Sequence, residues 1–222
     1  HCSVRRQRQM CIRDRDLKGG VLMPGDGAAD PSGVTHMLAK GARLGGAKIF
    51  EQSPVETILT KNGRVCGVRV NGQDIECEYV VLATGMWSRQ IGEKIGVSIP
   101  LYPAEHFYVI TEPIENLSPT LPVIRDFDSS TYIKEDAGKL LIGIFEGKSI
   151  PAFNKTNKVP EDFSFGEFPE NFDHFEPYLE KSIKRFPILE QAGIRKFFSG
   201  PESFTPDTCL LYTSPSPRDW LQ

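Results

Sequence analysis

Residues 79–87 read Tyr-Val-Val-Leu-Ala-Thr-Gly-Met-Trp, an apolar run that ends in small residues. Such a run is typical of a β-strand buried on both faces, as in a parallel sheet. Thr84 and Gly85 predict a turn at its end, and glycine lets the backbone approach a ligand closely. Ligands of α/β sheets bind beyond the carboxyl ends of the strands. These residues alone fit a cofactor site and a plain strand-to-helix turn equally well.

The residues around this run predict a mixture of helices and short strands. Asp30 and Pro31 are favourable at the start of a helix, and Gly45-Gly46 would end it. Asn71-Gly72 is a strong hairpin turn. The predicted order is a helix from Pro31, strands at 48–50, 55–60, 65–70, 74–78 and 79–83, and a helix at 88–95.

The sequence after Pro100 has a different character, because strand-like segments follow one another without helices between them. This order indicates an antiparallel sheet. Residues 151–169 are rich in Pro, Phe, Asn and Asp and predict a loop. Residues 172–186 predict an amphipathic helix with its large apolar side chains on one side. The predicted strands are 106–111, 121–125, 131–134, 140–145 and 195–199.

The two ends of the chain differ from its middle. Neither residues 1–15, with five arginines and one acid, nor residues 209–222 have helical or strand periodicity. Codons for both ends can be written as one DNA element read in opposite directions, which resembles a transposon adapter used in sequencing libraries. We therefore expect disordered, adapter-derived ends and an internal segment, 16–208, of a longer protein. The alternative is a basic arm and a flexible tail.

The composition excludes several classes of protein. Of 222 residues, 39% are hydrophobic and 25% are charged, which is ordinary for a globular chain of one large or two small domains. No apolar run is long enough to span a bilayer. The 26 basic and 29 acidic residues give a net charge of −3. Without the two ends the charge is about −7, so binding of nucleic acid through a basic face is not expected. Five cysteines do not suggest a disulfide scaffold.

Few residues suggest chemistry by themselves. The sequence has no G-x-S-x-G elbow and no P-loop. Cys66 and Cys77 are too few ligands for a metal site, so none is expected. His106 stands among aromatic residues, where a histidine is more often packed than catalytic. Tyr132 alone is an ordinary strand tyrosine, and His174 has the setting of a structural or exposed residue.

Taken together, several phrases resemble the flavin-dependent dimethylglycine and sarcosine dehydrogenase family, within the D-amino-acid-oxidase-like group. They occur in order across nearly all of residues 16–207. The long phrases are specific to that family, whereas A-T-G-x-W alone would indicate only a flavoprotein. The phrases are PGDGAADPSGVTHMLAKGARLGGAKIFE, VVLATGMWSRQIG, PLYPAEHFYVITEPI, EDFSFGEF, EPYLE and AGIRKFFSGPESFTPD.

The resemblance implies a truncated two-domain fold of the α/β plus α+β class. A partial Rossmann-like domain would bind FAD through residues 16–99 and 195–208, and an antiparallel-sheet domain, residues 100–194, would bind the substrate. Val55 matches the strand whose backbone contacts the adenine. The residues that match the turn against the phosphate and ribityl groups are Ala83, Thr84, Gly85, Met86 and Trp87.

The resemblance also implies a reaction. His106 matches the active-site histidine of the family and Tyr132 its active-site tyrosine. The expected activity is oxidation of an N-methyl amino acid, such as dimethylglycine or sarcosine, with hydride transfer to the flavin. The electron acceptor would be an electron-transfer flavoprotein or oxygen. The expected location is the cytoplasm of a bacterium or the mitochondrial matrix of a eukaryote.

The sequence also departs from the family pattern. It lacks the family's N-terminal G-x-G-x-x-G, which holds the pyrophosphate, and the histidine that attaches FAD covalently in several members. The segment after Asp207 that closes over the flavin is replaced, and the downstream tetrahydrofolate-binding domains are missing. We therefore expect an inactive chain derived from an active enzyme.

Two other functions remain open at this level. One is a non-catalytic relative of the same fold that regulates a partner phosphatase by binding it. The other is an oxidase for glycine, a D-amino acid or glycerol 3-phosphate. His106 and Tyr132 favour an enzyme over the first, and the phrase PESFTPD favours the dehydrogenase branch over the second.

Overall fold

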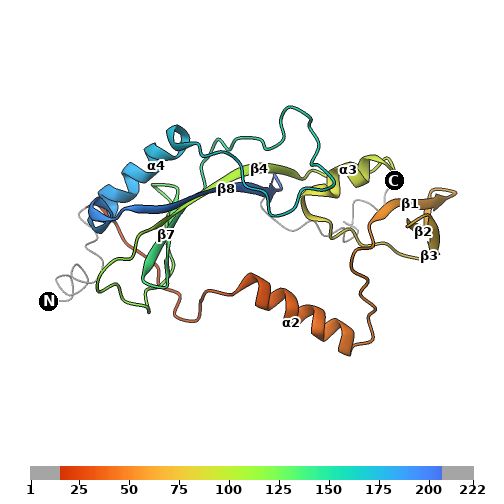
Figure 1. The fold of residues 1–222 in the computed structure, drawn as a ribbon, viewed down its shortest axis with the longest axis horizontal. Coiled ribbons are helices and arrows are strands. Elements are labelled where there is room, and N and C mark those ends of the chain that lie inside the picture. Colours follow the sequence, from red (N-terminus) through yellow and green to blue (C-terminus); the bar gives the residue numbers. More distant parts are fainter. Residues whose placement is uncertain (1–15, 207–222) are drawn as a thin grey trace. The chain divides into compact units, whose positions relative to one another are not determined.

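A computed structural model describes residues 16–206 of the chain (Figure 1). The expectations for residues 1–15 and 209–222 therefore lie outside the described residues. The chain divides into two compact units. The first, here the sheet unit, contains described residues 16–49, 105–150 and 165–201. The second, here the hairpin unit, contains described residues 50–104, 151–164 and 202–206.

A five-stranded sheet, in the order β5-β6-β7-β4-β8, confirms the expected antiparallel sheet. The pairs β5–β6, β6–β7 and β4–β7 are antiparallel. Ala137 and Gly138 join β6 to β7 with φ of 50° and 79°, the left-handed backbone that a tight hairpin requires. The strands are β4 (Tyr102–Thr111), β5 (Ile124–Asp126), β6 (Thr131–Asp136), β7 (Lys139–Ile144) and β8 (Ile194–Phe204).

One face of this sheet forms the hydrophobic core with helix α4, Phe172–Arg185. The helix begins at Asn171, whose side chain accepts a hydrogen bond from the backbone N–H of His174 at 3.2 Å. A 3-10 turn, Pro187–Gln191, follows it and adds Leu189 to the core. The buried core residues are Phe107, Val109, Ile133, Leu140, Ile142, Ile144, Phe175, Phe186, Leu189 and Phe197.

The hairpin unit confirms the expected meander. Strands β1 (Val55–Lys61), β2 (Arg64–Val70) and β3 (Gln73–Glu76) pair in sequence order. Asn71 and Gly72 have φ of 51° and 73° at the β2–β3 turn, as its hairpin signal requires. A short 3-10 helix, Gly85–Trp87, leads directly into α3, Ser88–Glu93, close to the predicted helix.

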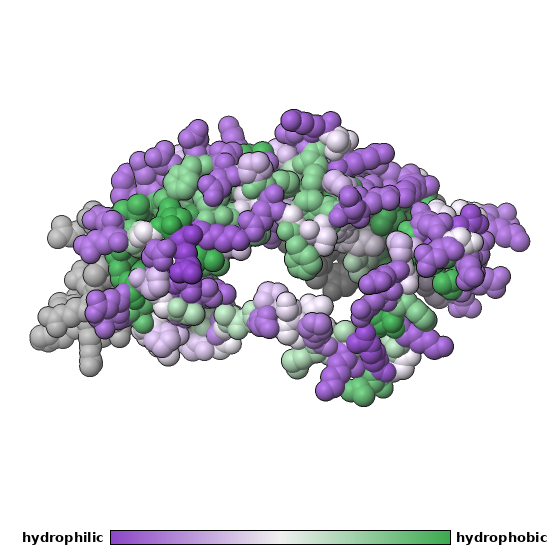
Figure 2. Space-filling model, viewed as in Figure 1, coloured by the Kyte–Doolittle hydropathy of each residue, from purple (hydrophilic) through white to green (hydrophobic). Residues whose placement is uncertain are grey.

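Helix α2, Pro31–Leu44, begins as predicted, because Asp30 accepts hydrogen bonds from the backbone N–H groups of Ser32 and Gly33. Hydrophobic and hydrophilic side chains alternate over its surface in Figure 2. Its apolar residues Met37 and Leu38 are exposed. None of the helices within residues 16–206 is long and apolar enough to cross a membrane.

Two of the predicted strands do not form. Residues 48–50 and 79–83 have no strand partner among the described residues, and Tyr79 and Val81 are 86% and 87% exposed. A strand exists only through its neighbours, and burial on both faces needs further layers above and below it. The prediction of a doubly buried strand at 79–83 is therefore wrong for this chain, although the turn that follows it forms.

The core should be sensitive to the loss of Phe175, which is fully buried. Phe175→Ala is expected to lower the free energy of unfolding by about 3–5 kcal/mol, because it leaves a cavity in the hydrophobic core beside Phe197. Urea denaturation measures the change. Phe165→Ala is the matched control, because Phe165 is fully exposed. A similar loss of stability in both variants would contradict this description of the core.

Candidate functional site

His106 and Tyr132 meet on the face of the sheet opposite the core. His106 Nε2 and Tyr132 Oη lie 3.2 Å apart, within hydrogen-bond distance. Their strands, β4 and β6, are separated by β7, whose following residue Phe145 completes the cluster. The Phe145 ring centre lies 5.0 Å from that of His106 and 5.3 Å from that of Tyr132. The structure thus brings together two residues that are 26 positions apart in the sequence.

Gly143 makes this meeting possible. It is the β7 residue that pairs with both Tyr132 on β6 and Tyr108 on β4. A Cβ atom at position 143 would overlap the ring and hydroxyl of Tyr132. The missing side chain therefore lets the tyrosine ring lie across β7 toward His106. A glycine inside a strand often marks such a close approach, so Gly143 was itself a signal in the sequence for this contact.

Alternation along β4 separates the core from the candidate site. Phe107 and Val109 are fully buried, whereas His106 and Tyr108 lie on the other face and are partly buried. Tyr108 stacks on Phe198 of β8, with ring centres 4.5 Å apart. Burial raises the pKa of Tyr108, so its hydroxyl remains protonated at neutral pH. The site face therefore carries two phenol groups and one imidazole.

Arg125 also belongs to this face and was missed in the sequence. Its guanidinium carbon lies 4.6 Å from the Phe145 ring centre. Nothing in the local sequence distinguishes it from a surface arginine, because its place beside Tyr132 depends on the pairing of β5 with β6.

A second group of charged residues lies on the core face, at the start of α4. His174 Nε2 and Glu146 Oε1 are 3.1 Å apart, and only 2% of the Glu146 side chain is exposed. Burial raises the pKa of the nearby Glu105 carboxyl. The His174 ring also packs against Phe107, with ring centres 5.2 Å apart. These contacts fit the structural role expected of His174.

The expected cofactor-binding turn lies in the hairpin unit. Gly85 has φ of 53°, and a side chain there would meet no other atom within 4 Å, so its surroundings are open. Thr84 Oγ1 and Ser88 Oγ lie 2.9 Å apart. Ala83 and Gly85 are exposed, whereas Met86 and Trp87 are partly buried and anchor the turn. An exposed backbone of small residues fits the close approach of a phosphate or sugar group.

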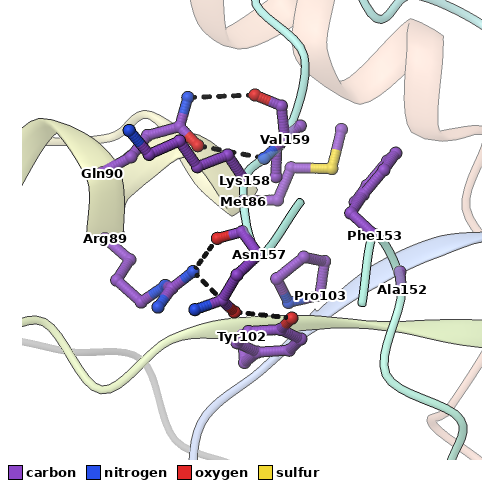
Figure 3. A pocket seen from close by; sticks show the side chains of 10 residues that line it. All are labelled: Met86, Arg89, Gln90, Tyr102, Pro103, Ala152, Phe153, Asn157, Lys158 and Val159. Carbon is purple, nitrogen blue, oxygen red and sulfur yellow. Dashed lines mark hydrogen bonds between the residues drawn. The ribbon is translucent and has the colours of Figure 1, made fainter. Parts of the chain in front are cut away.

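The loop 151–164 holds this turn in place (Figure 3). Gln90 Nε2 donates to the carbonyl of Val159, and the Val159 N–H donates to Gln90 Oε1, both at 3.1 Å. Arg89 donates to the carbonyl oxygen of Asn157, and Tyr102 donates to Asn157 Oδ1 at 3.0 Å. Most of the side chains that Figure 3 labels therefore belong to α3 and to this loop.

Trp87 and Val55 are tied into the same unit by other contacts. Trp87 Nε1 donates to the carbonyl of Pro160 at 3.0 Å. Val55 begins β1, is paired with Val70 and is about half exposed. Lys94, just after α3, donates to the carbonyl of Glu56 at 3.4 Å. The hairpin unit thus links the segments that contain Val55 and residues 83–87, whereas His106 and Tyr132 belong to the sheet unit.

Gly143→Ala tests the close packing under Tyr132. We expect a loss of about 1–3 kcal/mol in the free energy of unfolding, because the methyl group displaces the tyrosine ring. Urea denaturation of Gly143→Ala, Tyr132→Ala and the double variant gives the coupling energy. The cost of Gly143→Ala should fall in the Tyr132→Ala background. Gly147→Ala is the control, since its added methyl group meets nothing within 4 Å. Equal costs in both backgrounds would contradict the packing.

Comparison with known proteins gives the context of both sites. The family model described as FAD dependent oxidoreductase matches residues 3–220. The chain is 39% identical over 191 residues to 4-methylaminobutanoate oxidase (formaldehyde-forming) of Paenarthrobacter nicotinovorans, covering 86% of this chain and 23% of that protein. It is 36% identical over 197 residues to human mitochondrial sarcosine dehydrogenase, with 86% and 21% covered.

Another similar protein is named as a regulatory subunit and not as an enzyme. The mouse mitochondrial pyruvate dehydrogenase phosphatase regulatory subunit is 36% identical over 204 residues, covering 90% of this chain and 23% of that protein. The chain thus spans less than a quarter of the length of these three relatives.

A solved structure is similar to most of this chain. L-proline dehydrogenase from P. horikoshii aligns with a TM-score of 0.66 and 28% identity, covering 83% of this chain and 46% of that one. This similarity and the family match establish a D-amino-acid-oxidase-like FAD-binding fold with an antiparallel sheet and helices.

Proposed function

Because this chain belongs to the FAD-dependent oxidoreductase family and is of the sarcosine and dimethylglycine dehydrogenase type, we propose that the protein containing it oxidises an N-methylated amino acid. The observation that carries the proposal is the contact between His106 and Tyr132 on the site face. An imidazole beside a phenol, next to aromatic rings, provides a proton acceptor and a hydroxyl for an amine substrate.

His106 has the central role in this proposal. An ammonium group has no lone pair to form the iminium product, so the amine must lose its proton before it is oxidised. Histidine changes its charge near neutral pH and is therefore suited to accept that proton or to orient the neutral amine. Tyr132 holds the imidazole in place through its hydroxyl and positions the substrate. FAD, when bound, supplies the oxidation by accepting a hydride from the N-methyl carbon.

The hairpin unit would hold the cofactor. The open backbone at Ala83, Thr84 and Gly85 fits the phosphate and ribityl part of FAD, with Met86 and Trp87 anchoring the turn. Val55 would offer its strand backbone to the adenine. In this proposal residues 16–99 and 195–208 belong to the FAD-binding domain and residues 100–194 to the substrate domain.

The proposal extends to the partners of the whole protein. Electrons would pass from the reduced flavin to an electron-transfer flavoprotein or to oxygen, and a tetrahydrofolate-binding domain would lie downstream. Since similar dehydrogenases are named as mitochondrial, the matrix is the proposed location in a eukaryote, and the cytoplasm in a bacterium.

Replacement of His106 tests the mechanism in a full-length protein that contains this chain. His106→Gln should slow the reduction of the flavin by sarcosine or dimethylglycine about 100-fold, because general acid–base catalysis contributes at least that factor. Stopped-flow absorbance measures the rate. His36→Gln is the control, because His36 lies on the exposed surface of α2. An unchanged rate would show that His106 has another role.

A second function is supported by the similarity to the phosphatase regulatory subunit. In that case the protein would keep the fold and act by binding a partner. The same absorbance experiment separates the two functions. Bleaching of the flavin by an N-methylated amino acid supports the enzyme. A folded, FAD-containing protein that no such amine bleaches supports the binding function.

The 222-residue chain by itself should not form a stoichiometric complex with FAD. Residues 79–83 find no neighbouring strand among the described residues, so the sheet that would support the cofactor is incomplete. Equilibrium dialysis of the purified chain against FAD should give well under one FAD per chain. A yellow one-to-one complex would overturn this expectation and would place a sufficient cofactor site within these residues.

A further inference from the structure

Two cysteines lie directly opposite each other in the β2–β3 hairpin. The register pairs Gly67 with Glu76, so the next pair toward the open end of the hairpin is Cys66 with Cys77. The Cys77 N–H donates to the Cys66 carbonyl at 3.1 Å, which extends the ladder between β2 and β3 (Figure 1) by this pair. Directly opposed residues of neighbouring strands point to the same face of a sheet. The two thiols therefore lie on one side of the hairpin.

The spacing of these two strands suits a disulfide. The Cα atoms of a hydrogen-bonded antiparallel pair are about 5.5 Å apart, and a disulfide joins Cα atoms that are about 4.4–6.8 Å apart. Gly67, next to Cys66, lets the strands lie close together, because a Cβ atom there would overlap the carbonyl oxygen of Ile75. The directly paired Arg69 and Asp74 form a salt bridge of 2.6 Å, so opposed side chains of this hairpin do meet.

A β-bulge lies at Cys66. The register between β1 and β2 shifts by one residue between Leu59 and Thr60, and Cys66 is the extra residue on β2. Bulges of this kind change the direction in which a side chain points. Cys66 is exposed, whereas Cys77 is partly buried. Cys66 is therefore the thiol that an oxidant in solution contacts first.

We propose that Cys66 and Cys77 form a reversible cross-strand disulfide, with hydrogen peroxide as the oxidant. The Cys66 thiolate attacks one peroxide oxygen, the O–O bond breaks, and a sulfenic acid and hydroxide form. The Cys77 thiolate then attacks the Cys66 sulfur, the S–O bond breaks, and the S–S bond forms. In total, two thiols and one peroxide give one disulfide and two water molecules. The step requires neither FAD nor an amine substrate.

The disulfide would stabilise the open end of the hairpin. The turn end is already held, because Glu56 of β1 accepts a hydrogen bond from the Gly72 N–H at 2.8 Å. Strand β3 ends at Glu76, and residues 78–84 form no helix or strand. A covalent bond at Cys77 would keep this end of β3 paired with β2. Exposed disulfides are readily reduced again, so the bond would respond to the redox conditions around the protein.

The test uses the 222-residue chain after the other three cysteines are replaced by serine; these are Cys2, Cys11 and Cys209. Trypsin cleaves after arginine, so Cys66 and Cys77 fall in different peptides, 65–69 and 70–89. After treatment with hydrogen peroxide, mass spectrometry should find these peptides joined, with the loss of two hydrogen atoms. Dithiothreitol should separate them, and a non-reducing gel should show a single chain. A link between two chains, or oxidised cysteines without a link, would overturn the proposal.

The matched control combines Cys77→Ser with Ile75→Cys in the same chain. It moves one thiol by two residues along the same face of β3, so the two thiols become diagonal neighbours. Diagonal residues are about 7–8 Å apart, beyond the usual span of a disulfide. The link between the two peptides should be lost, and circular dichroism checks that the control is folded. Equal linking in both folded proteins would contradict the proposal, because the bond would then not depend on the register.

Hydrogen exchange gives a second measurement that needs no substitution within the hairpin. Oxidation should slow the exchange of the backbone amides of residues 66–77 several-fold, because a covalently closed end opens less often. Dithiothreitol should restore the original rates. Unchanged or faster exchange in the linked chain would overturn the proposal, since the native hairpin would then not be the structure that the disulfide stabilises.

Discussion

The contact between the Tyr132 ring and the bare backbone of Gly143 is the constraint on which the candidate site depends. The candidate site requires three strands to be in register, because Gly143 pairs with Tyr132 on β6 and with Tyr108 on β4. Any side chain at this position would take the space of the ring. The distance between His106 and Tyr132 is therefore set by the backbone of β7 rather than by the local conformation of either residue.

The two faces of the sheet have different roles, because one forms the hydrophobic core and the other carries the candidate site. Residues such as Phe107 and Ile142 pack under α4 and are buried, and their neighbours in the sequence point to the opposite face. A register shift of one residue would exchange the two sets. The hydrophobic core therefore fixes the direction of His106 and Tyr132, which contribute little to it. The two site residues therefore take their orientation from the core even though they are themselves only partly buried.

Sequence-based prediction succeeded where the signals were local and failed where the structure depended on residues distant in the sequence. Alternation and turn residues predicted the strands near His106 and the Asn71-Gly72 hairpin, because these signals are local. Residues 79–83 were predicted wrongly, since a buried strand needs partners that the described residues do not supply. The position of Arg125 on the site face could not be predicted from its neighbours in the sequence, because it depends on the pairing of β5 with β6. Gly143 could have been recognised, since glycine within a strand is itself a signal.

The tight hairpin at Ala137 and Gly138 has a consequence for the order in which the site assembles. Strands β6 and β7 are adjacent in the sequence, so closing their loop costs little conformational entropy and their pairing should be an early folding event. Between His106 and Tyr132 the chain forms a loop and strand β5, so their contact is of longer range in the sequence. The Tyr132 ring would therefore pack over Gly143 before His106 forms its contact with Tyr132. In folding kinetics, the histidine–tyrosine contact would act as a marker that the central strands have completed their assembly.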